Sequence, residues 1–124
     1  MKTIFIILLA LSLQMCATRP QTKQRGCFKG KLVKRGICGQ RVIQLLSEPS
    51  AGIAFAVNWT DSLSGKQYAK VFSVGNTCDF PVSVKEGDEF SFTLTNIPAP
   101  DCIQCYAYTP VPAEKNNVAV GCGK

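Results

Sequence analysis

The chain of 124 residues contains no histidine. Histidine is the side chain that most readily changes charge near neutral pH, a frequent metal ligand and the usual partner of serine and cysteine nucleophiles. Its absence excludes those kinds of site. We find no other catalytic motif that the residues support, and we therefore expect no catalytic residues, no metal site and no cofactor.

Acidic residues are missing from the first third of the chain, since the earliest of the eight is Glu48. The segment before it is rich in basic residues: Arg19, Lys23, Arg25, Lys29, Lys31, Lys34, Arg35 and Arg41. The formal net charge of +6 therefore belongs to the N-terminal part of the chain. This asymmetry predicts an anionic partner or an anionic surface nearby.

The sequence also lacks an apolar run long enough to span a bilayer, which takes about 20 residues. Its longest run extends only from Ile4 to Leu11 and follows Lys2. A positive charge, a short apolar segment and a small-residue exit are the parts of a secretory signal peptide. We therefore expect residues 1–17 to direct export and the mature chain to work outside the cytoplasm.

Two cleavage positions fit this leader. Cleavage after Ala17 gives a secreted protein. Cleavage before Cys16 gives a protein that a lipid on Cys16 anchors to a bacterial membrane, because Leu13-Gln14-Met15-Cys16 resembles a lipobox. Met15 is larger than the residue that either site prefers, so both alternatives stay open.

Seven cysteines are present, and either cleavage leaves six for pairing. In a small exported domain such a set is typical of a disulfide framework, here Cys27, Cys38, Cys78, Cys102, Cys105 and Cys122. The sequence leaves their pairing open. An alternative is a thiol–disulfide exchange enzyme that uses the Cys102-x-x-Cys105 motif. We favour structural disulfides, because Asp101 raises the pKa of a neighbouring thiol and no helix follows the motif.

No window has the three-to-four-residue apolar spacing of a long helix. Apolar and polar residues instead alternate, which predicts strands at 27–34, 41–46, 53–59, 67–74, 89–96, 102–109 and 117–122. We expect one all-β domain over residues 27–124, preceded by a disordered basic tether over residues 18–26. The opening hairpin, the entry to a late strand at Glu86–Phe90 and the short final strand resemble an OB-fold. The expected architecture is a small disulfide-stapled β-barrel, and a seven-stranded immunoglobulin-like β-sandwich is the alternative.

Five short segments together resemble small, uncharacterised exported proteins of Bacteroidota. They are Cys27-Phe28-Lys29-Gly30, Asn58-Trp59-Thr60-Asp61 with Gly65-Lys66, Cys78-Asp79-Phe80-Pro81, Glu86-Gly87-Asp88-Glu89-Phe90 and Cys102-Ile103-Gln104-Cys105-Tyr106-Ala107-Tyr108. The resemblance covers nearly the whole mature chain. It implies an origin and a compartment and brings no activity with it.

The first predicted hairpin carries the candidate binding residues Lys29, Lys31, Lys34, Arg35 and Arg41. We expect its basic exposed face to contact an anionic polymer or a membrane surface, with aromatic stacking from Tyr106 or Tyr108. Nucleic acid is not an expected partner in vivo, because exported proteins rarely meet it. The competing interpretation is an ordinary solvated face, and it is the more common outcome for basic surfaces.

Overall fold

The computed structural model describes residues 26–50, 52–97, 100–102, 105 and 107–123. Its strands are β1 (Phe28–Arg35), β2 (Arg41–Leu45), β3 (Ala56–Thr60), β4 (Gln67–Val74), β5 (Glu89–Leu94), β6 (Lys115–Asn116) and β7 (Val118–Val120). A 3-10 turn, η2 (Thr77–Asp79), lies between β4 and β5. Within these residues no α-helix is present, which confirms the prediction of an all-β domain. The predicted leader, the predicted lipid attachment site Cys16 and nearly all of the predicted tether lie outside the described residues.

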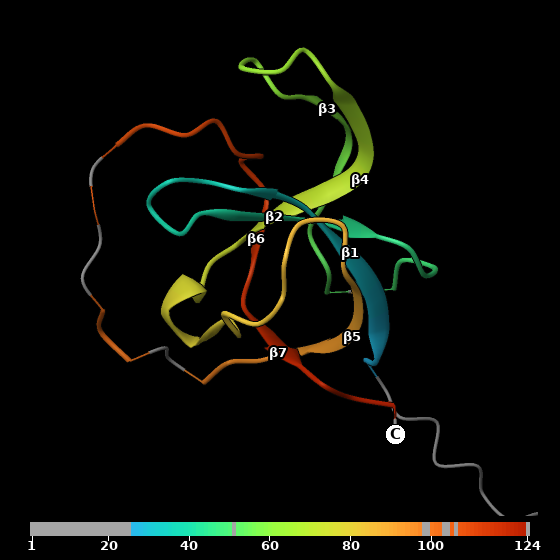
Figure 1. Cartoon of the computed structure of the whole chain (residues 1–124). Helices are drawn as coiled ribbons and strands as arrows, with labels where there is room; N and C mark the ends of the chain where they lie inside the picture. The colour runs from blue at the N-terminus through green and yellow to red at the C-terminus, as the bar shows by residue number, and fades with distance from the viewer. Residues whose placement is uncertain (1–25, 51, 98–99, 103–104, 106, 124) are drawn as a thin grey trace, which may run out of the picture.

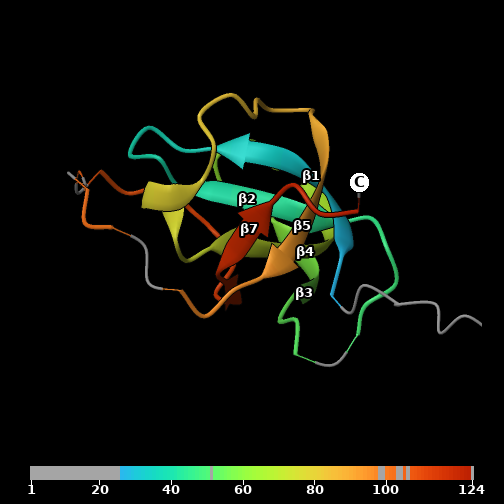
Figure 2. The same ribbon diagram turned by 90° about the horizontal axis from the view of Figure 1, so that it is seen from below.

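The seven strands form one curved sheet in the order β3-β4-β2-β1-β5-β7, while β6 pairs with β4 (Figures 1 and 2). All pairings are antiparallel except that of β6 with β4. The sheet does not close, so the predicted barrel is wrong, and a sandwich of two sheets is not formed either. The C-terminal segment comes close to closing the sheet, because β6 pairs with β4 and the adjacent β7 pairs with β5. Its parallel contact involves only two residue pairs, and β7 and β3 remain the edges.

The hairpin of β1 and β2 forms as predicted, with Gly30 paired to Leu45 and Arg35 to Arg41. Gly30 faces the core at a point where a side chain does not fit. A Cβ atom there would lie 2.7 Å from Cγ2 of Ile43 and 2.9 Å from Cε1 of Phe92. Glycine at this position therefore allows the ring of Phe92 to pack directly on β1.

The core lies in the concave side of the sheet and is built around Phe72 and Phe92, both fully buried. It also contains Phe28, Ile43, Leu45, Ile53, Val74, Phe80 and Val118. The predicted apolar face of β5 is confirmed, since Phe90 and Leu94 pack against this cluster beside Phe92. Strands β1, β2, β4, β5 and β7 and the residue that follows η2, Phe80, thus contribute to one core, as expected for a domain of this length.

Two buried asparagines hold the irregular C-terminal segment in place. The side-chain amide of Asn76 donates to the carbonyl of Val118 and accepts from its N–H group, both at 2.8 Å. Asn116 makes the same pair of bonds with Ala54, donating at 2.6 Å and accepting at 3.0 Å. Each amide thus takes the place of a neighbouring strand as the hydrogen-bond partner of one backbone residue.

Two predicted strands differ from the structure. The strand expected at 53–59 begins only at Ala56, and Val57 on it is 67 % exposed, because β3 is an edge strand. The strand expected at 102–109 is not formed by its described residues, which are irregular. Cys102 and Cys105 in that segment are each bonded to a different part of the fold, which prevents a regular ladder.

The six cysteines predicted to pair form three disulfides: Cys27–Cys122, Cys38–Cys105 and Cys78–Cys102. Their Cα atoms lie 5.8, 5.2 and 5.6 Å apart, within the usual range. The first joins the start of β1 to the end of β7, and the other two fasten the 100–109 segment to the hairpin tip and to η2. Disulfides persist in oxidising compartments, so this domain belongs outside the cytoplasm. Over the described residues, no helix has the length and apolar character needed to cross a membrane.

Candidate anion-binding site

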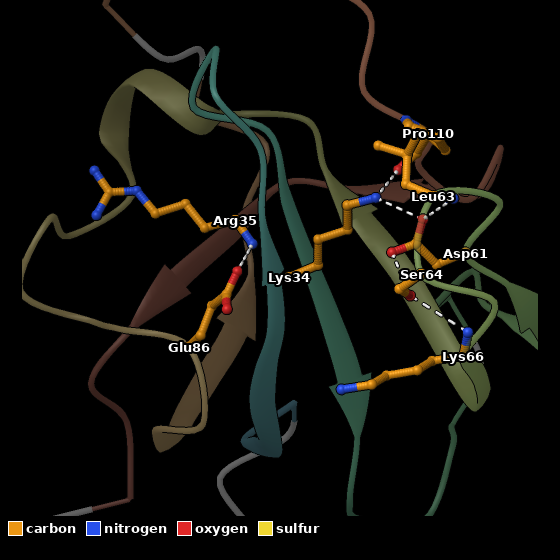
Figure 3. A network of polar contacts seen from close by, with 8 residues as sticks. All are labelled: Lys34, Arg35, Asp61, Leu63, Ser64, Lys66, Glu86 and Pro110. Carbon is orange, nitrogen blue, oxygen red and sulfur yellow. Dashed lines mark hydrogen bonds and ion pairs between the residues drawn. The ribbon is translucent and has the colours of Figure 1, made fainter.

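The predicted basic face is divided between the two sides of the hairpin. The pairing of β1 with β2 shifts register between Leu32 and Lys34, which marks a β-bulge. Lys29 and Lys31 alternate with core-facing residues and lie on the side away from the core, which we call the outer face. Beyond the bulge Lys34 stays on the outer face, whereas Arg35 pairs with Arg41 on the core side. Figure 3 shows Lys34 and Arg35 pointing to opposite sides of β1.

Lys34 is part of an internal network and not of an exposed charged surface, contrary to the prediction. Its ammonium group donates to Oδ1 of Asp61 at 2.8 Å and to the carbonyl of Pro110 at 3.2 Å (Figure 3). The side chains of Lys34 and Asp61 are only 14 % and 7 % exposed. The same ammonium lies 5.7 Å from the centre of the Trp59 ring. These contacts join β1, the β3–β4 turn and the segment before β6.

Asp61 is brought to Lys34 by the curvature of the β3–β4 hairpin. Within β4 only Val71–Ser73 pair with β2, and the residue that precedes them, Lys70, has a positive φ of 54°. Beyond that point β3 and β4 curve away from the rest of the sheet (Figure 1). The carboxylate of Asp61 also accepts from the N–H group of Leu63 at 3.0 Å and from the hydroxyl of Ser64 at 3.0 Å. The hydrogen bond from Lys34 is the main cause that lowers the pKa of Asp61 below its ordinary value of 3.8.

Acidic residues border the remaining basic positions on β1. Glu89 on β5 is the partner of Lys31 in the sheet register, and a carboxylate oxygen of Glu86 accepts from the N–H group of Arg35 at 2.7 Å. Glu86, Asp88 and Glu89 are all exposed. The described residues contain no group of three or more candidate ligands that could hold a metal ion. The acidic turn therefore moderates the positive charge of the neighbouring strand.

Arg41 is buried and makes no ion pair within the described residues, although it was predicted to extend the exposed charge. It is 4 % exposed, and its Nη1 donates to the carbonyls of Gly39 and Thr77 at 3.0 and 3.2 Å. Its guanidinium lies 4.9 Å from the centre of the Phe80 ring. Burial lowers the pKa of Arg41, and the charge of Arg35 across the hairpin lowers it further.

A pocket of about 180 Å³ opens beside Arg41. It lies between the hairpin tip and the end of β4, with the Cys38–Cys105 disulfide and Lys115 of β6 in its wall. Gln40 also lines it, and the side chain of Gln40 holds the hairpin tip by accepting from the N–H group of Cys38 at 3.0 Å. The sequence contains no local signal for this pocket, because its wall joins residues from distant parts of the chain.

The Cys102-x-x-Cys105 motif does not form a bond within itself. Cys102 is bonded to Cys78 and Cys105 to Cys38. An exchange dithiol alternates between a reduced pair and a bond joining the same two sulfurs, so this pairing favours a structural role.

The aromatic stacking predicted from Tyr106 or Tyr108 stays a prediction. Tyr108 is 83 % exposed, and Tyr106 lies outside the described residues. The aromatic pair beside Lys34 is Trp59 with Tyr68, whose ring centres lie 6.1 Å apart. Comparison of the chain with protein-family models, curated proteins and solved structures found no match.

Proposed function

We propose that the protein is an exported binding module that contacts an anionic polymer or membrane surface through Lys29 and Lys31 on the outer face of β1. The observation that supports this is the environment of these two lysines. They are two residues apart on one strand and on one face, Lys29 is exposed and Lys31 is partly exposed. Neither makes an ion pair within the described residues, where Lys34 with Asp61 is the only one.

The spacing of the two lysines suits a charged polymer. Alternate residues on a strand lie about 6.5–7 Å apart, so both ammonium groups reach the same side. The OB-like resemblance stays a prediction and is not needed for this proposal.

Charge reversal on the outer face tests the proposal. We expect the wild-type mature protein to be retained weakly on heparin at low salt and released as salt rises, because release of counterions drives such binding. The Lys29→Glu/Lys31→Glu variant should elute without retention. Circular dichroism should show that the variant folds normally, since both side chains lie on the outer face.

A matched control separates this surface from net charge. Lys66→Glu/Lys85→Glu makes the same charge change at two exposed residues that belong neither to β1 nor to β2 and do not line the pocket beside Arg41. We expect that variant to keep most of the retention. Equal loss in both variants would show that heparin responds to overall charge, and retention that survives in the β1 variant would place the binding surface elsewhere.

The form in which the module is exported has its own test. We propose attachment through a lipid on Cys16, with soluble secretion as the alternative. Expressed in a bacterium with its own leader, the protein should be found with the membranes, and Cys16→Ser should release it or stall its processing. A soluble wild-type protein that begins at Thr18 would contradict lipid attachment and leave export itself intact.

A further inference from the structure

Arg41 is a buried positive charge without a counter-charge. Arg41 forms no ion pair within the described residues, where Lys34 with Asp61 is the only one. Its Nε atom is buried and has no hydrogen-bond partner. Burial of an unpaired charge costs free energy, and the two backbone carbonyls that Nη1 contacts offset only part of that cost.

A second positive charge lies on the wall of the same pocket. Lys115 of β6 lines the pocket together with Arg41, and none of the residues that line it is acidic. Arg35 adds a third charge nearby, because it pairs with Arg41 across the hairpin. Like charges that face each other across two strands repel, so the arrangement lowers stability when no anion is present.

The pocket is also small and fixed in shape. At about 180 Å³ it is below the roughly 300–1,000 Å³ of pockets that take drug-sized ligands. The Cys38–Cys105 disulfide forms part of its wall, and the hydrogen bonds of Gln40 with the N–H group of Cys38 and the carbonyl of Ala107 hold that wall. Such a site suits a compact group and not a segment of polymer.

We infer that this pocket binds a small oxyanion, a phosphate or carboxylate group, held between Arg41 and Lys115. This inference does not depend on the proposed contact of Lys29 and Lys31 with a polymer, because those residues lie on the opposite side of the hairpin. The anion supplies the charge that Arg41 lacks in a site where water screens poorly. Phosphate binds more strongly than acetate, because it carries more charge to share between the two cations.

Thermal unfolding at constant ionic strength tests the site. Sodium phosphate replaces sodium chloride stepwise, and sodium acetate is a second series. Because a ligand that binds only the folded state stabilises it, we expect phosphate to raise the Tm by on the order of 5 °C at about ten times its dissociation constant. Acetate should raise the Tm less. A Tm in phosphate that is no higher than the Tm in chloride at the same ionic strength would overturn the inference.

Three variants locate the binding. Lys115→Gln changes an exposed residue and should lose at least half of the phosphate-dependent rise. Arg41→Met should lose all of it, whatever its Tm without phosphate, and the Lys29→Glu/Lys31→Glu variant should keep the whole rise. An unchanged rise in Lys115→Gln would overturn the inference even if Arg41→Met does not fold. A rise that is lost only in the Lys29→Glu/Lys31→Glu variant would place the anion on the outer face and overturn it as well.

Discussion

Reduction of all three disulfides should leave the domain largely unfolded at 37 °C. Loss of a native disulfide from a small secreted domain costs about 2–5 kcal/mol, and the whole stability of such a domain is about 5–15 kcal/mol. The core is modest, since nine buried residues make up its cluster, four of them phenylalanines. Circular dichroism of the mature protein, heated with and without excess reductant, measures the effect.

The three disulfides should not contribute equally. Cys27–Cys122 joins residues 95 positions apart, whereas Cys78–Cys102 joins residues 24 apart. A longer loop restricts the unfolded chain more, so the Cys27→Ala/Cys122→Ala variant should lose about 1 kcal/mol more than Cys78→Ala/Cys102→Ala. A melting temperature that does not change on reduction would show that the cysteines do not stabilise this fold.

Substitution of Asp61 should be the most damaging single change outside the core. Asp61→Ala leaves the Lys34 ammonium buried without a counter-charge and removes the acceptor of Leu63 and Ser64. Breaking a buried pair from one side costs about 3–5 kcal/mol. Urea unfolding should show this loss, while the exposed Glu86→Ala should cost about 1 kcal/mol or less.

A double variant and a pH series separate the pair from its surroundings. Lys34→Met/Asp61→Ala should cost less than the sum of the two single changes, because no unpaired charge remains. The folded-state pKa of Asp61 is lowered, so its contribution is complete above the ordinary value of 3.8 and is lost as pH falls below it. Asp61→Ala should therefore weaken the acid dependence of stability. Additive costs, or an unchanged pH profile, would contradict the role given to the pair.

The sequence predicted those features that depend on neighbouring residues. Alternation gave β1, β2 and β5, and Phe90, Phe92 and Leu94 share a buried side as expected. Six cysteines in an exported chain indicated disulfides, and three are formed. These patterns are local consequences of strand geometry and of redox compartment.

Other features depend on contacts between distant residues and were missed. Lys34 and Arg35 were both assigned to the exposed charge of the hairpin. A bulge after Leu32, which has no signature in the alternation, keeps Lys34 on the outer face and places Arg35 on the core side. Nothing local to Lys34 indicates that the β3–β4 turn brings Asp61 to it. The barrel was expected because strand spacing does not reveal which edges meet. Arg41 and Lys115 meet across 74 positions of sequence, and no motif marks the pocket.

The salt dependence of heparin affinity tests the proposed binding surface most directly. Affinities of the wild type and of Lys29→Gln/Lys31→Gln, measured by titration at several salt concentrations, give the slope of log affinity against log salt. Each lysine that contacts a fixed anionic charge contributes about one unit to that slope. We predict weaker binding in the variant and a slope shallower by about two units. An equal slope in both proteins would contradict a polyanion-binding surface at Lys29 and Lys31.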